Sequence, residues 1–139
     1  MLLQVIIGAL LSITIALAAY LRHSLVKSGF IAAVLLGTII YAFGGFFVWI
    51  ALILFFISAR LLTKIHEKKE NDHTKGRNYI QVISNGIVAA IFSVLFYFLN
   101  NEIFLIAAVV AIATSNSDTW ASEIGILSKG KTRNVISFK

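Results

Sequence analysis

The stretch 30-FIAAVLLGTIIYAFGGFFVWIALILFFISA-59 contains no charged residue. A helix crosses the hydrocarbon of a bilayer with about 20 residues, so this stretch is too long for one upright span and short for two. Gly44 and Gly45 lie near its middle, where a break or tight turn of the backbone costs least. We therefore expect a helical hairpin with arms over residues 29–44 and 46–62, in preference to one tilted helix.

Three further apolar blocks accompany this stretch in a chain of 139 residues that is 59% hydrophobic and only 13% charged. A soluble domain of this size could not cover so much apolar surface. The chain has no Cys, which excludes disulfides and thiolate chemistry. The sequence predicts a single integral membrane domain, 1–139, with an all-α, polytopic transmembrane fold. Its bundle should contain about five hydrophobic helices, over residues 2–20, 29–44, 46–62, 80–99 and 103–127, the last with a polar interruption.

The four apolar blocks are Leu2–Tyr20, Phe30–Ala59, Ile80–Leu99 and Ile103–Leu127. All lysines and arginines lie between these blocks or in the C-terminal tail, and the connection Asn100-Asn101-Glu102 has none. If Gly44-Gly45 turns a hairpin, every basic residue falls on one face of the membrane. The positive-inside rule then places that face in the cytoplasm, with 60–79 as a charged cytoplasmic loop and the N-terminus outside. A single tilted helix would instead put Arg22 and Lys27 outside. We expect a multi-pass protein of the cell membrane. No nucleic-acid partner is expected, because the basic residues flank membrane spans.

The last apolar block contains a polar motif, 114-TSNSDTWASEIG-125. At a rise of 1.5 Å per residue, Asp118 lies about 22 Å beyond Ile103, in the cytoplasmic half of a hydrocarbon core about 30 Å thick. Glu123 lies near the cytoplasmic edge. Ionisable groups at such depths are costly and are functional candidates by default.

Two conformations of this motif are open. In a continuous helix, Asn116, Thr119 and Glu123 share one face, while Ser115, Asp118 and Ser122 share an adjacent one. Alternatively, the helix unwinds around 115–118 and its backbone lines a polar cavity.

Polar residues also mark the start of the third block, in 81-QVISNG-86. Gln81 and Asn85 are four residues apart and share a helix face, at the same depth as the acidic motif. We expect the two helices to line one shared cavity that opens toward the cytoplasm. The structural alternative is that these amides and hydroxyls join helices, at about 0.6 kcal/mol per hydrogen bond.

Three stretches carry a resemblance to a known family: 27-KSGFIAAVLLGTIIYAFGGFFVWIALILFFISARLLTK-64, 75-KGRNYIQVISNG-86 and 117-SDTWASEIG-125. They resemble the integral-membrane family of transmembrane protein 19 and the plant phytyl-phosphate kinase, also called domain of unknown function 92. The family similarly continues into a Gly-rich motif and further spans, so the resemblance implies that this chain is the N-terminal part of the family domain.

The resemblance to the plant relative implies a kinase that transfers a phosphoryl group from a cytoplasmic nucleoside triphosphate to an isoprenoid phosphate. Mg²⁺ favours one or two carboxylates together with phosphate oxygens and water. Asp118 is the first candidate for catalysis and Mg²⁺ binding, and Glu123 is the second. Candidate substrate-binding residues are Asn85, Asn116, Thr119 and Ser122, with the cations Lys75, Arg77 and Arg133 for the phosphate.

Two other functions remain open. A transporter or flippase-like carrier would bind a cation or proton at Asp118 and Glu123. A non-catalytic scaffold would use its polar groups only to join helices. The short hairpin arms need further spans, or a second copy in a homo-oligomer, to bury their small-residue faces.

Overall fold

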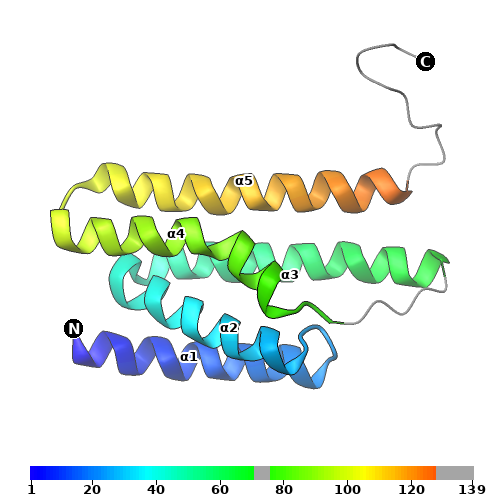
Figure 1. Ribbon diagram of the computed structural model, residues 1–139, viewed down its shortest axis with the longest axis horizontal. Coiled ribbons are helices and arrows are strands. Elements are labelled where there is room, and N and C mark those ends of the chain that lie inside the picture. Colours follow the sequence, from blue (N-terminus) through cyan, green and yellow to red (C-terminus); the bar gives the residue numbers. More distant parts are fainter. Residues whose placement is uncertain (71–75, 128–139) are drawn as a thin grey trace, which may run out of the picture.

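The computed structural model describes residues 1–70 and 76–127, which form an elongated bundle of helices (Figure 1). This confirms the all-α membrane bundle expected from the sequence. The elements, in order, are α1 (Leu2–Leu21), α2 (Lys27–Ile39), the short π-helix η1 (Ile40–Gly44), α3 (Gly45–Glu70), α4 (Tyr79–Leu99) and α5 (Glu102–Leu127).

Four stretches of the described chain, rather than five, are long and apolar enough to cross a membrane. They are Leu2–Leu21, Lys27–Ile65, Tyr79–Leu99 and Glu102–Gly125. The second stretch combines α2, η1 and α3. These three elements follow one another without a break, so they count as one apolar stretch of 39 residues. The expectation of five hydrophobic helices therefore overestimates the number of spans by one.

The chain reverses direction between η1 and α3, so the expected hairpin forms and the single tilted helix is wrong (Figure 1). Gly45 makes this turn possible with φ +79° and ψ −179°, a backbone region that is essentially restricted to glycine. Gly44 is buried, and a Cβ there would lie 2.6 Å from the Oγ of Ser93. The two glycines thus have different tasks, one in backbone geometry and one in close packing with α4.

Two helices are longer or more regular than expected. α3 continues to Glu70, so residues 60–70 of the expected cytoplasmic loop 60–79 are helical, and the placement of that loop in the cytoplasm stays a prediction. The Leu, Lys and Glu residues in this segment have high helix propensity. α5 is continuous through its polar motif, so the expected alternative of unwinding around 115–118 is wrong. The hydroxyls of Thr114 and Ser117 donate to carbonyls four residues earlier in the helix, which satisfies them without breaking it.

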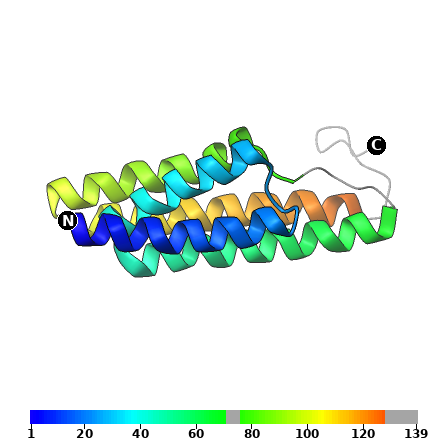
Figure 2. The ribbon, with the colours of Figure 1, turned by 90° about the horizontal axis from the view of Figure 1, so that it is seen from below.

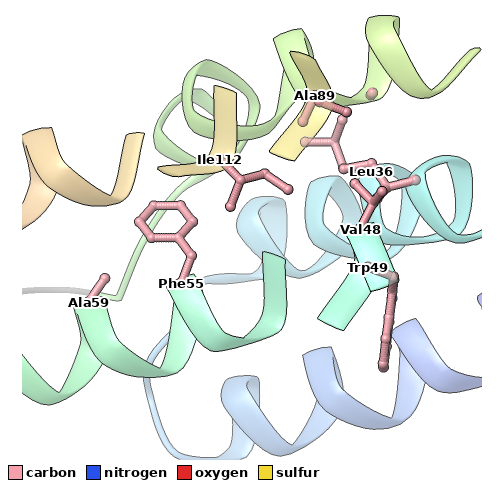
Figure 3. Close-up of a cluster of buried hydrophobic side chains, with 10 residues drawn as sticks. Leu36, Val48, Trp49, Phe55, Ala59, Ala89 and Ile112 are labelled. Carbon is pink, nitrogen blue, oxygen red and sulfur yellow. The ribbon is translucent and has the colours of Figure 1, made fainter. Parts of the chain in front are cut away.

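The apolar core lies where α2, α3, α4 and α5 meet. Phe55 of α3 lies beside Ile112 of α5, and Leu36 of α2 lies near Val48 of α3 (Figure 3). Trp49 points the other way, toward α1 (Figure 3), and its Nε1 donates to the Oγ of Ser12 at 3.2 Å. This tryptophan therefore joins α3 to α1.

Candidate functional site

The described basic residues gather at one end of the bundle, which we call the basic end. α1 ends there, α2 begins, α3 ends and α4 begins, as both views show (Figures 1 and 2). The turn at η1 and the connection Asn100–Asn101 lie at the opposite end. Among the residues whose side chains the structure describes, the lysines and arginines of the basic end are Arg22, Lys27, Arg60, Lys64 and Arg77.

Two loops are joined at the basic end by backbone hydrogen bonds around Arg77. The N–H of Arg77 donates to the carbonyl of Ser24 at 3.0 Å, and the N–H of Val26 donates to the carbonyl of Arg77 at 3.1 Å. A Cβ at Gly29 would collide with that same Arg77 carbonyl oxygen, and a Cβ at Gly76 would lie 2.7 Å from the carbonyl oxygen of His23. The two glycines therefore allow the segment before α4 to pack directly on the start of α2.

Three charged side chains converge beside this junction. Burial lowers the pKa of the Arg77 guanidinium from its ordinary value; the negative charge of Glu123 opposes this shift and the positive charge of Arg60 adds to it. The Nε of Arg60 donates to the Oγ of Ser24 at 3.0 Å. Arg60 of α3, Arg77 before α4 and Glu123 near the end of α5 are thus coupled by charge, and we call these three residues the charged junction.

The polar face of α5 packs against α3. The Oγ1 of Thr63 donates to the Oε1 of Glu123 at 2.6 Å, and the Oγ of Ser58 donates to the Oδ1 of Asn116 at 3.1 Å. Trp120 of α5 donates from Nε1 to the same Ser58 hydroxyl at 3.3 Å. Asn116, Glu123 and also Thr119 are half-buried, as expected for residues that share one face of a continuous helix.

Asp118 lies on the outer face of α5, away from α3. Its side chain is exposed, and no hydrogen bond or ion pair joins it to any of the residues that the structure describes. Five residues separate Asp118 from Glu123, which places the two carboxylates about 140° apart around the helix axis and about 7.5 Å apart along it. Ser122 is also exposed. The two acids therefore have different surroundings, and they do not converge on one point.

A cavity of about 70 Å³ lies between α1, α2, α3 and α4. Gln81 and Asn85 line it together with Arg77, so the polar start of α4 does face a cavity. Among the residues that the structure describes, none of those that line the cavity comes from α5. The expectation that α4 and α5 line one shared cavity is therefore wrong. The polar face of α5 packs against α3 instead.

Sequence reasoning placed some site residues and missed others. Of the predicted phosphate ligands, Arg77 belongs to the charged junction, whereas Lys75 and Arg133 lie outside the described residues. The sequence did not lead us to expect Arg60 in the charged junction or Thr63 as a hydrogen-bond donor to Glu123. Their spacing of three residues, which places both on one side of α3, was the available signal.

These observations define a polytopic helical membrane protein with a charged junction at one end and an apolar cavity beside it. The chain belongs to the family described as "Integral membrane protein DUF92", which matches residues 10–139. It is 33% identical to Protein PGR of Arabidopsis thaliana over 156 residues, covering 98% of this chain and 54% of that protein. It is also 32% identical to an uncharacterised membrane protein of Methanocaldococcus jannaschii over 142 residues, covering 99% of this chain and 59% of that protein.

The chain therefore spans somewhat more than half the length of these curated relatives. No solved structure matches it.

Proposed function

We propose that this chain forms the lipid-phosphate site of a membrane phosphotransferase, which transfers a phosphoryl group from a nucleoside triphosphate to an isoprenoid phosphate. One observation carries the proposal: the half-buried Arg77 belongs both to the charged junction and to the wall of an apolar cavity. A cation at the boundary between apolar and charged surroundings suits an amphiphile with an anionic head. Arginine is also the side chain best shaped to bind phosphate oxygens in pairs.

The other junction residues have supporting tasks in this proposal. Phosphoryl transfer depends mainly on positioning and on neutralising charge. Arg60 adds a second positive charge, and its bond to Ser24 holds it near the loop that also bonds to Arg77. Glu123, held by Thr63, is proposed to balance part of the positive charge of Arg77. Asn116 and Thr119 fix α5 against α3, and Lys75 and Arg133 are proposed to add phosphate contacts.

The Mg²⁺ that would accompany the nucleotide is assigned to Asp118. Mg²⁺ needs only one or two carboxylates when phosphate oxygens and water complete its shell. The exposed carboxylate of Asp118 fits this requirement, with Ser122 one turn further along the helix. Glu123 fits less well, because its Oε1 already accepts from Thr63. Because Asp118 faces away from the charged junction, Mg²⁺ bound there would neutralise charge on the phosphates of the nucleotide and not on the lipid phosphate at Arg77.

This reaction needs the basic end in the cytoplasm, where nucleotides are available, and the N-terminus outside. The clustering of the described Lys and Arg residues at one end supports that orientation through the positive-inside rule. A carrier would instead concentrate its polar groups near the middle of the bilayer. The charged junction lies at one end, which favours chemistry at the membrane surface over transport.

The test measures Mg²⁺-dependent transfer of labelled phosphate from a nucleoside triphosphate to a prenyl phosphate, using the purified protein in lipid vesicles. Asp118→Asn should lower turnover by about a hundredfold or more, since it removes the metal carboxylate. Arg77→Gln should mainly raise the KM for the prenyl phosphate. Glu102→Gln is the matched control, because it changes an acid of the same helix at the opposite end.

The control variant should keep wild-type turnover. Wild-type turnover in a correctly inserted Asp118→Asn protein would overturn the assigned role of that residue. A folded wild-type protein that transfers no phosphate from any of the common nucleoside triphosphates would overturn the proposed function itself.

A further inference from the structure

The cavity between α1, α2, α3 and α4 is too large to be an ordinary packing defect. Native cores contain few voids larger than a water molecule. A volume of about 70 Å³ would admit about five waters at 10–15 Å³ each. A void of this size left empty would forfeit the contacts of all the side chains around it. The cavity is partly open to the surroundings of the bundle, so an occupant can enter it from there.

Water does not suit most of this cavity. A buried water needs two to four polar partners, yet most of the walls are apolar, with Ile15, Leu36 and Phe55 among them. The hydroxyl of Ser12, deep in the bundle, already accepts from Trp49. Hydrocarbon is the occupant that matches such walls, and a membrane surrounds the protein with it.

The polar residues of the cavity are concentrated toward the basic end. Arg77 precedes α4, and Gln81 and Asn85 lie in its first two turns. Along α1, the lining runs from Ala19 back to Ser12, a distance of about 10 Å. The cavity thus has a cationic end near the membrane surface and an apolar end deeper in the bundle, which is the polarity of an anionic lipid that enters tail first.

We infer that this cavity binds the segment of a single lipid chain closest to its phosphate head, with the head at Arg77. The inference rests on the proposed function for the identity of the head, and adds the place and the size limit of the hydrocarbon. Small residues from three helices, Ala19, Ala33 and Gly86, form part of the walls. They set the width of the cavity, so the bulk of the chain near the head decides which lipids are accepted.

The test uses photolabelling without nucleotide. The probe is an alkyl phosphate with a diazirine about five carbons from the head, which is within the roughly 10 Å depth of the cavity. The full-length protein in phosphatidylcholine vesicles is labelled, digested and analysed by mass spectrometry. We expect labels on cavity-lining residues of α1 and α2. Excess unlabelled alkyl phosphate should suppress these labels. This competition experiment uses only the wild-type protein.

A matched pair of variants on α1 tests the position. Ala19→Phe places a ring in the wall of the cavity, whereas Ala18→Phe places the same ring on the exposed side of the helix. Labelling should fall about tenfold in Ala19→Phe, since a filled cavity cannot also admit the chain, and should stay within about twofold in Ala18→Phe. Circular dichroism spectra establish that both variants are folded. A misfolded Ala19→Phe leaves the wild-type competition to decide.

The chemistry of the head is tested with the matching alcohol as a neutral probe and with Arg77→Gln. Both should lower labelling about tenfold, because each removes one partner of a charge-assisted contact. Equal labelling by the alcohol would mean that the cavity takes up bilayer hydrocarbon in general, which overturns the proposed anionic ligand. Labels confined to outward-facing residues and insensitive to competitor would overturn the site.

The two proposals can fail separately. Loss of labelling with intact phosphate transfer would refute the cavity as the lipid site. Intact labelling without transfer would refute the reaction and leave the lipid site standing.

Discussion

Replacing Gly45 with Ala tests the hairpin that gives the molecule its shape. Gly45 adopts φ +79° and ψ −179°, and residues with a Cβ pay about 1–3 kcal/mol to occupy this region. A Cβ added at Gly45 would meet no atom within 4 Å, so steric contact contributes nothing. The expected loss in the free energy of unfolding is therefore about 1–3 kcal/mol, and it comes from the backbone alone.

Gly125→Ala is the control, because a Cβ there also meets nothing within 4 Å while the residue is helical in α5. Alanine is favoured over glycine in a helix by about 0.5–1 kcal/mol, so this variant should be slightly more stable than the wild type. The two variants should then differ by about 1.5–4 kcal/mol, roughly ten- to thousandfold in the unfolding equilibrium. Reversible denaturant unfolding in mixed micelles measures the difference. If Gly45→Ala matches Gly125→Ala, the turn geometry assigned to Gly45 is wrong.

Two further substitutions test the basic end. Gly29→Ala forces a Cβ against the carbonyl oxygen of Arg77, and should cost about 1–3 kcal/mol of unfolding free energy by overpacking; unfolding at the wild-type denaturant concentration would contradict that contact. Thr63→Val removes the hydroxyl that donates to Glu123, and should cost about 1.5–3 kcal/mol. Thr14→Val is its control, since that hydroxyl donates only within its own helix; equal losses in the same assay would dismiss the Glu123 contact.

The features that the sequence predicted are those that depend on local chemistry. Apolar runs of spanning length predict helices because a bilayer leaves backbone groups no other partner. The hairpin followed from Gly44 and Gly45, since few other residues adopt the conformation found at the turn. The shared face of Asn116, Thr119 and Glu123 followed from helical spacing alone. None of these inferences required knowledge of a neighbouring helix.

The features that could not be predicted depend on how helices pair. A membrane helix is apolar on most of its surface, so its pattern does not reveal which side meets protein. The burial of Glu123 against Thr63, and the exposure of Asp118, follow from the rotation of α5 about its axis. Contacts such as that between Phe55 and Ile112 set this rotation (Figure 3). The cavity likewise depends on four helices at once, so the sequence could not separate it from the polar face of α5.

On the outer face of α5, Asp118 is the exposed residue to which the proposed function assigns a metal ion. The hydroxyls of Thr114 and Ser117 on the same exposed side are satisfied by carbonyls of their own helix. An ionised carboxylate cannot do the same, because it has no proton to donate. A bare charge at the centre of a bilayer costs about 2.5–3.5 kcal/mol even on insertion scales. A cation with its water would remove much of that cost, and this is the reason why the proposed function assigns the metal to the exposed Asp118 and not to Glu123, which already accepts from Thr63.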